Sequence, residues 1–155
     1  MSNRSHVRCA ICLALLVSLC LPLPVLAVGG GPAPAPVAPR SAEAEYNKGL
    51  QAKGMKRFSD AITDFRHAVE LRPNFAEAWN ELGFALRQTG QYGEALSAYD
   101  QALRLRPNFP EALEYLGEAY VKLGRLGDAQ AILNRLSSLD SEQARELAEA
   151  IRAGQ

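Results

Sequence analysis

The sequence predicts an all-α protein, an α-solenoid of three helix-turn-helix repeats that ends in a C-terminal capping helix. The first observation is a repeat, because the motif Leu71-Arg72-Pro73-Asn74-Phe75 returns 34 residues later at positions 105–109. A period of this length is typical of stacked units of supersecondary structure. The second is that apolar residues follow helical spacing and no segment alternates with period two. The third is that small residues keep the same register, namely Gly49, Gly83 and Gly117, and Ala61, Ala95 and Ala129.

Each repeat is expected to contain two helices joined by a short turn. Gly90 and Gly124 fall in the turns of the second and third units, where a positive φ is often needed. Pro73 and Pro107 end the second helices of the first two units. The repeats span 42–75, 76–109 and 110–143, with helices at 42–54, 58–71, 76–88, 92–105, 110–122 and 126–138.

The C-terminal segment 140–153 predicts a seventh helix. Asp140 precedes Ser141-Glu142-Gln143 in the form of a capping box, with Asp140 as N-cap. An apolar stripe follows on one side of this helix. We expect the stripe to cover the exposed face of the last repeat, and the alternative is that the helix docks onto a partner. The stripe consists of Ala144, Leu147, Ala148 and Ile151.

The N-terminal segment 1–27 is typical of a secretory signal peptide. Arg4 and Arg8 precede an apolar run that ends at prolines, and Ala27 offers a small residue for cleavage. We therefore expect an exported protein, periplasmic or secreted. The alternatives are a retained membrane anchor, or lipid attachment at Cys20. Unless the segment is retained or Cys20 carries a lipid, the mature domain is not expected to insert into a membrane.

Residues 28–41 are expected to form a Pro/Ala/Gly-rich linker, as either a semi-rigid spacer or a plain disordered tail. Cleavage after Ala27 would remove all three cysteines, so the mature chain would form no disulfide. The whole chain has 17 basic and 17 acidic residues, and the loss of Arg4 and Arg8 leaves a charge of −2. This near-neutral balance predicts no binding of nucleic acid.

The repeats resemble the tetratricopeptide repeat family, whose pattern of Trp, Leu-Gly, Tyr, Ala and Pro fits the second unit best. The outer units depart from this pattern at Glu45 and Lys48, and at Leu133, Leu136 and Ser141. The resemblance implies a right-handed α-solenoid in which the first helices of the units line a concave face. The matching residues of the second unit are Trp79, Leu82, Gly83, Leu86, Gly90, Ala95, Tyr99, Ala102 and Pro107.

The concave face is the candidate binding site for a protein or peptide. Rings flanked by amides and charges suit peptide recognition, since rings supply contact area at a small entropy cost. The alternative for Phe84 and Tyr115 is that they simply pack between neighbouring helices. The candidate residues are Tyr46, Asn47, Leu50, Asn80, Glu81, Phe84, Arg87, Tyr115 and Glu118. One variant of the family binds the C-terminal carboxylate of a peptide through Lys, Asn and Arg side chains. In this chain other residues occupy the positions of those side chains, including Tyr46, Leu50, Glu81 and Glu111.

No pattern in the sequence predicts catalysis, a cofactor or a metal. His67 is the one histidine after residue 27, and no further ligands stand near it at fixed spacing. The serines have no histidine partner at a spacing typical of an activated nucleophile. We therefore expect a non-enzymatic interaction module. The alternative is a structural component that associates with itself in a larger envelope assembly.

Overall fold

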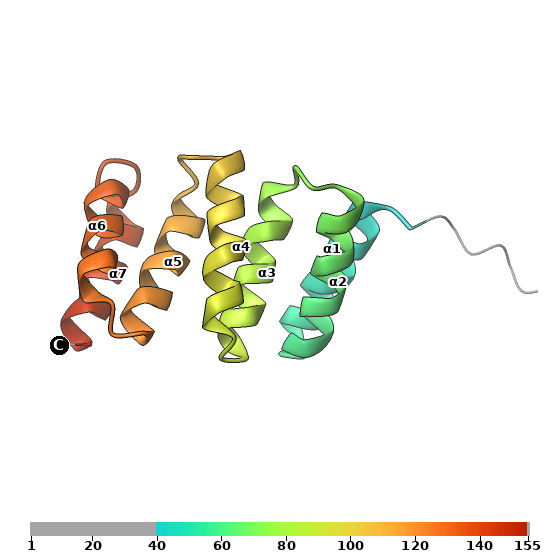
Figure 1. Cartoon of the computed structure of the whole chain (residues 1–155), viewed down its shortest axis with the longest axis horizontal. Helices are drawn as coiled ribbons and strands as arrows, with labels where there is room; N and C mark the ends of the chain where they lie inside the picture. Colours follow the sequence, from blue (N-terminus) through green and yellow to red (C-terminus); the bar gives the residue numbers. More distant parts are fainter. Residues whose placement is uncertain (1–39, 155) are drawn as a thin grey trace, which may run out of the picture. The chain divides into compact units, whose positions relative to one another are not determined.

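The computed structural model describes residues 40–154, and Figure 1 shows their helices standing side by side in a row. The signal-peptide, anchor and lipidation predictions, and the linker up to residue 39, lie outside the described residues. All regular structure in the described range is helical. The helices are α1 (Ala42–Gly54), α2 (Phe58–Leu71), α3 (Ala76–Gln88), α4 (Tyr92–Leu105), α5 (Pro110–Lys122), α6 (Leu126–Leu136) and α7 (Ser141–Ala153).

Three helix pairs stack into a solenoid, and each pair contacts the next. The closest pairings are α1 with α2, α3 with α4, and α5 with α6. The backbones of the first helices approach one another, α1 with α3 and α3 with α5, whereas those of α2, α4 and α6 stay further apart within residues 40–154. The solenoid therefore curves towards its first helices. We call the side lined by α1, α3 and α5 the inner face, and the side lined by α2, α4 and α6 the outer face.

The helix ends agree with the sequence interpretation except at α6. This helix ends at Leu136, two residues before the expected residue 138, and Ser137 begins a turn that leads to α7. Gly90 and Gly124 adopt the positive φ expected of the turns, with values of 78° and 68°. At the equivalent position of the first unit, Lys56 carries the positive φ of 57°. The backbone turn is therefore repeated even where the glycine is not.

The core of each unit is built on a glycine that faces a large side chain. A Cβ atom on Gly49 would lie 2.5 Å from the Phe65 ring, and one on Gly83 would lie 2.6 Å from the Tyr99 ring. In the third unit the position of these rings is taken by Leu133, which is only partly buried. Gly117 instead faces Leu147 of α7, whose side chain would clash with a Cβ atom on Gly117. The seventh helix therefore completes the packing of the last unit.

The start of α7 confirms one half of the predicted capping box. The Asp140 carboxylate accepts hydrogen bonds from the N–H groups of Glu142 (2.9 Å) and Gln143 (3.0 Å). The reciprocal bond from Gln143 was predicted wrongly. The Asp140 N–H donates to the Leu136 carbonyl instead, at 2.9 Å, because the chain turns tightly after α6. The Gln143 side-chain oxygen is left buried without a partner among the described residues.

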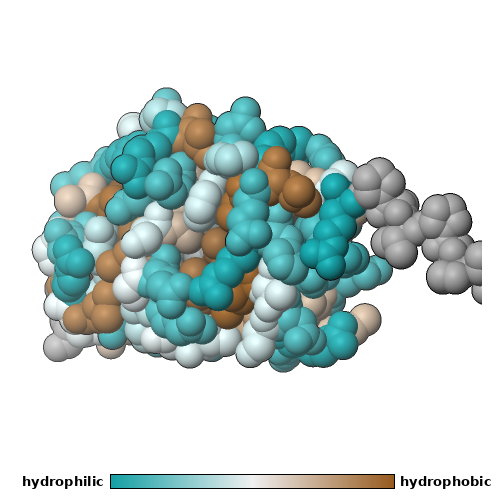
Figure 2. All heavy atoms as spheres, turned by 45° about the vertical axis from the view of Figure 1, so that its right-hand side comes forward, coloured by the Kyte–Doolittle hydropathy of each residue, from teal (hydrophilic) through white to brown (hydrophobic). Residues whose placement is uncertain are grey.

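The surface of the described chain is mixed. Figure 2 shows hydrophobic side chains appearing between larger polar areas on one face of the molecule. The helices of the described range include none that combines the length and hydrophobicity required to cross a membrane.

Candidate functional site

The inner face carries corresponding residues from the three units at the 34-residue spacing. Tyr46, Asn80 and Glu114 share one position on the first helices. Because equivalent positions on stacked helices point the same way, these side chains form rows across the face. The next rows are Asn47, Glu81 and Tyr115, then Leu50, Phe84 and Glu118, and then Lys53, Arg87 and Val121.

The centre of the inner face is an aromatic cluster around Phe84 of α3. Its ring lies 5.3 Å from the Tyr115 ring of α5 and 6.2 Å from the Phe58 ring at the start of α2, measured between centroids. Lys53 and Arg87 both place their charged groups near the Phe84 ring, at 5.1 Å and 5.4 Å from its centroid. Phe84 and Tyr115 remain half-buried, so the cluster both joins the units and presents aromatic surface.

Two ion pairs tie neighbouring first helices together beside these rings. Lys53 of α1 bonds to Glu81 of α3 at 2.5 Å, and Arg87 of α3 bonds to Glu118 of α5 at 2.7 Å. The side chains of Glu81 and Arg87 are largely buried. Each pair spans two units, and therefore holds the inner face in one register.

The structure brings five of the nine predicted site residues into this central cluster, namely Glu81, Phe84, Arg87, Tyr115 and Glu118. The alternative interpretation of Phe84 and Tyr115 is also partly correct, because they pack between neighbouring helices.

Tyr46, the sixth predicted residue, packs on Phe75 with 4.8 Å between the ring centroids. Burial raises the pKa of Tyr46, and the nearby Glu81 and Glu77 raise it further.

The other three predicted residues lie apart from this cluster. Leu50 packs against the core. Asn47 is exposed, and its side chain forms no hydrogen bond or ion pair with residues 40–154. Asn80 is buried, with 4% of its surface exposed, although its row places it on the inner face. Its side-chain oxygen has no hydrogen-bond partner in the described part of the chain. A buried acceptor without a donor is costly, and in native proteins such an atom calls for an explanation.

A second polar group lies at the third-unit end of the inner face. Glu114 of α5 is 7% exposed, and the carboxyl group of Glu146 on α7 lies near it. Burial, the neighbouring Glu146 carboxyl group and the charge of Glu118 raise the Glu114 pKa to about 7, and Arg87 acts in the opposite direction. Glu146 could not be predicted as part of the site from the repeat, because α7 lies outside the 34-residue register. It also missed Phe58, whose place at the first turn of α2 gave no indication of the inner face.

A hollow of about 360 Å³ adjoins this end of the face, between α5 and α7. The Arg87–Glu118 pair and Lys122 border it on one side, and the last turn of α7 borders it on the other. The lining residues from this side are Ala150 and Ala153 of α7 and Gly154, which caps the helix.

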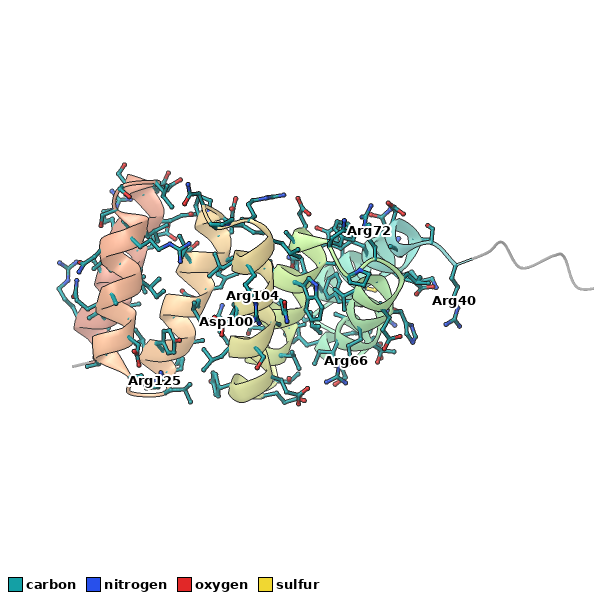
Figure 3. The ribbon with its side chains drawn as sticks, turned by 45° about the horizontal axis from the view of Figure 1, so that its top comes forward. Arg40, Arg66, Arg72, Asp100, Arg104 and Arg125 are labelled. Atoms are coloured by element: carbon teal, nitrogen blue, oxygen red, sulfur yellow. The ribbon has the colours of Figure 1, made fainter. Side chains whose placement is uncertain are left out.

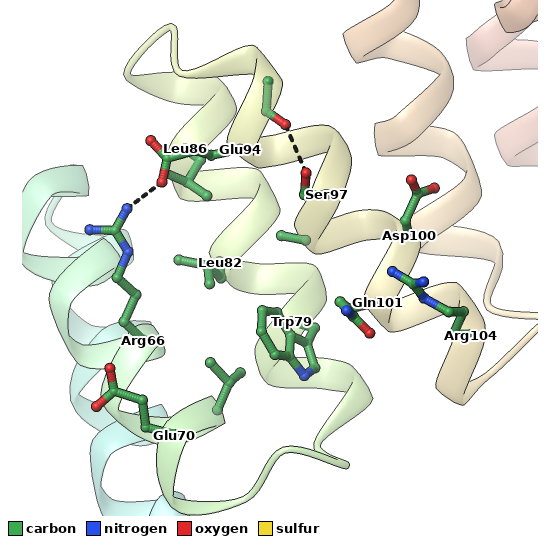
Figure 4. Close-up of a pocket in the computed structure, with 13 residues that line it drawn as sticks. Arg66, Glu70, Trp79, Leu82, Leu86, Glu94, Ser97, Asp100, Gln101 and Arg104 are labelled. Atoms are coloured by element: carbon green, nitrogen blue, oxygen red, sulfur yellow. Dashed lines mark hydrogen bonds and ion pairs between the residues drawn. The ribbon is translucent and has the colours of Figure 1, made fainter.

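The outer face carries a larger groove that the sequence analysis did not predict. It has a volume of about 860 Å³ and lies between α2 and α4, with Trp79, Leu82 and Leu86 of α3 among its lining residues (Figure 4). The Trp79 indole donates a hydrogen bond to the Pro73 carbonyl at 2.8 Å. Arg66 and Glu94 form an ion pair between α2 and α4 at 2.6 Å. Figure 3 shows Arg66, Asp100 and Arg104 along this side of the molecule.

The end of the solenoid at α1 gathers charged groups around Glu45. Glu45 stands where the second unit has Trp79, yet it is 2% exposed. Its carboxylate accepts from Lys48 at 3.1 Å and lies 3.8 Å from Arg40. Two basic side chains therefore neutralise it.

Side chains that could ligate a metal ion do lie near His67 in space, although the sequence showed none at a metal-site spacing. The structure places ligand atoms of Glu45, Asp64 and His67 within 4.8 Å of one another. Spacing alone did not reveal this set because Glu45 comes from another helix. Lys48 and Arg40 already neutralise Glu45, so the cluster is best described as an ion-pair network.

Comparison with known proteins places these features in context. Four models of tetratricopeptide repeats match the chain, at residues 42–75, 65–97, 85–124 and 111–141. No curated protein matches the sequence. Several solved structures are similar at low identity, which shows the shared fold.

Three of these structures illustrate the match. The TPR domain of OM64 from Arabidopsis has a TM-score of 0.70 at 19% identity, covering 74% of this chain and 97% of that one. The TPR2B domain of yeast Sti1 in its pHsp70 complex has a TM-score of 0.69 at 19% identity, covering 73% and 94%. The first TPR of Spaghetti (RPAP3), bound to the HSP90 peptide SRMEEVD, has a TM-score of 0.68 at 20% identity, covering 73% and 92%.

Proposed function

The chain belongs to the tetratricopeptide repeat family, and we propose that it is a non-enzymatic interaction module whose inner face binds an extended segment of another protein. The observation that carries this proposal is the half-buried ring pair of Phe84 and Tyr115, framed by the two cross-helix ion pairs. Rigid aromatic surface that is already held in place costs little entropy when a partner binds.

Two of the similar structures support this mode of action. The yeast Sti1 domain is seen in a pHsp70 complex, and the Spaghetti repeat is bound to an HSP90 peptide. The family variant that binds a peptide C-terminal carboxylate uses side chains that this chain replaces, notably by Tyr46 and Leu50. We therefore propose that the partner is not bound by a C-terminal carboxylate.

We also propose that the protein acts outside the cytoplasm. The support is the N-terminal sequence, with Arg4 and Arg8 before an apolar run and a small residue at Ala27. The interaction would then take place in an envelope compartment or in the medium.

The experiment is a capture assay with the processed chain as bait in an envelope extract, followed by a binding titration with the captured protein. Phe84→Ala and Tyr115→Ala are each expected to weaken binding by about 1 kcal/mol or more, because their half-buried rings carry the proposed contact. The matched control is Arg104→Ala on the outer face, which is expected to bind normally. Circular dichroism must show that the variants keep their helical signal.

Trp79 gives a second readout that separates the two faces. It is the only tryptophan of the chain, and it lines the outer groove. A partner on the inner face is expected to leave its fluorescence emission unchanged. Normal binding by folded Phe84→Ala, together with a shift of the Trp79 emission, would place the partner in the outer groove and contradict the proposal.

The outer groove also supports a second candidate function, a structural component that associates with itself. Trp79 is only partly buried in this lining, and a second copy would cover the exposed part of its ring favourably. Light scattering at increasing concentration separates the two functions. A concentration-dependent dimer that is disrupted by Trp79→Ala, with no loss of helical signal, would favour self-association.

A further inference from the structure

We infer that two copies of this chain pair through their outer grooves, and that four charged side chains on the walls of each groove set how the copies fit. The four are Arg66 and Glu70 of α2, and Asp100 and Arg104 of α4. The inference does not depend on inner-face binding. It specifies the contacts of the self-association that the outer groove supports, and it leaves the inner face of each copy open to a partner.

The first observation is the arrangement of these charges along the groove. Figure 4 shows Arg66 and Glu70 on one side of the groove, and Asp100 and Arg104 on the other. Arg66 and Asp100 occupy equivalent positions of successive units, 34 residues apart, and so do Glu70 and Arg104. Equivalent positions on stacked helices lie at the same level. Each level therefore carries one positive and one negative side chain, and the signs are exchanged at the next level, one helical turn away.

This pattern of charges is complementary to itself. A second copy that covers the groove in an isologous contact is related to the first by a two-fold axis in the plane of the contact. If the axis runs across the helices, Arg104 meets Asp100 of the second copy. If the axis runs along the groove, Arg104 meets Glu70 of the second copy. Either axis brings opposite charges together at all four positions.

The second observation is that these side chains are available for such contacts. All four are exposed. Glu70, Asp100 and Arg104 form no ion pair with any residue of 40–154. Arg66 is bonded to Glu94 at 2.6 Å, but 45% of its side chain remains exposed to a further carboxylate. A second copy would supply the partners that the chain itself does not.

The inside of the groove supplies the apolar part of the contact. Trp79 lines it and is only partly buried, so a second copy would exclude water from the exposed part of the ring. Removal of apolar surface from water is favourable but has no preferred direction. Complementary charges fix the register of an interface and exclude wrong orientations. Trp79 therefore contributes affinity, and the four charges select the orientation of the second copy.

The test is a charge reversal in the processed chain, with dimerisation measured by analytical ultracentrifugation. The unmodified chain is expected to dimerise as its concentration rises, with a shift of the Trp79 emission to shorter wavelength as the ring loses water. Arg104→Glu brings like charges together for either axis, and is expected to weaken dimerisation about tenfold or more. The matched control is Arg145→Glu, the same change at an exposed position of α7, which should dimerise normally.

Mixtures of two variants show which charges meet. Arg104→Glu mixed with Asp100→Arg is expected to form a mixed dimer if the axis runs across the helices, because every contact between the two chains then joins opposite charges. Arg104→Glu mixed with Glu70→Arg is expected to do so if the axis runs along the groove. Each variant alone should dimerise poorly. Rescue by either mixture supports the inference, whereas rescue by neither, with normal helical signals, would overturn it.

A measurement on the unmodified chain keeps the inference testable if a variant fails to fold. Dimerisation is expected to weaken as the salt concentration rises from about 50 mM to about 500 mM, because salt screens exposed ion pairs. A chain that stays monomeric at every concentration, a dimer that Arg104→Glu leaves intact, or a dimer that does not respond to salt would contradict the inference. Each of these results would leave inner-face binding standing, since the capture assay with Phe84→Ala tests it separately.

Discussion

Gly83 of α3 lies directly against the ring of Tyr99 of α4, so that a Cβ atom on Gly83 would stand 2.6 Å from the ring. The ring is fully buried and held on its other sides by the core, and it has little freedom to move away. This contact sets how closely the two helices of the central unit approach. Replacement of Gly83 therefore tests the fold directly.

Gly83→Ala is expected to lower the free energy of unfolding by about 1–3 kcal/mol, because the added methyl group forces the Tyr99 ring or the helices apart. The matched control is Gly93→Ala in α4, where an added Cβ meets nothing within 4 Å. That change should be neutral or stabilising by up to about 1 kcal/mol. Urea unfolding followed by circular dichroism measures both. Equal stability of the two variants would show that Gly83 does not face the ring.

Tyr99→Phe is expected to leave the stability almost unchanged, within about 1 kcal/mol. The Tyr99 hydroxyl is buried and has no hydrogen-bond partner in the described range, so its removal leaves no donor unpaired. Phe65 fills the equivalent position of the first unit against Gly49. A loss of several kcal/mol in the same urea titration would reveal a hydrogen bond from the hydroxyl, with the nearby Arg87 as the first group to examine.

Leu147→Ala is expected to destabilise the protein by about 2–4 kcal/mol. Leu147 is fully buried on α7 and covers Gly117, so its loss opens a cavity between α5 and α7. Glu149→Ala, at an exposed position of the same helix, is the control and should change little. If α7 docked onto a partner instead of the last repeat, the two variants would melt at the same temperature in the isolated protein.

The raised pKa of Glu114 predicts that stability falls as the pH rises. The folded state binds this proton more tightly than the unfolded state, because the pKa moves from 4.5 to about 7. The contribution is therefore fully present below about pH 4.5 and is lost as the pH rises through 7. Glu77, whose pKa is lowered, acts in the opposite direction and only at more acidic pH.

Urea midpoints at several pH values measure this dependence. The Glu114→Gln variant should lose the decline between about pH 5 and pH 8, since it carries no proton to release. The Glu149→Gln control should retain it. A decline of the same size in Glu114→Gln would assign the effect to another group.

Export is tested by the mass of the protein recovered from a bacterial host. Cleavage after Ala27 would leave a chain that begins at Val28 and contains no cysteine. Mass spectrometry of the soluble periplasmic fraction should show this species. An intact Met1 in the membrane fraction would indicate a retained anchor, and a lipid-modified Cys20 would indicate the lipoprotein alternative.

The arrangement of helices could be predicted from the sequence because it repeats. The 34-residue register fixed three equivalent units, and the glycines at 90 and 124 placed two of the turns. The same register predicted the central residues of the inner face, since Phe84 and Tyr115 stand in neighbouring rows on successive first helices. A periodic sequence determines a periodic surface, because each unit packs on the next in the same way.

Only the tertiary structure determined the contacts at the two ends of the repeat array, where the 34-residue period stops. Helix α7 has no counterpart in the repeats, so no register predicted that Leu147 would face Gly117 or that Glu146 would lie near Glu114. The same holds at the other end, where Glu45 meets His67 from a different helix. These contacts depend on the angle and depth at which one helix docks on another. Side-chain shape and charge across the whole interface set that geometry, and helical spacing within a single segment does not encode it.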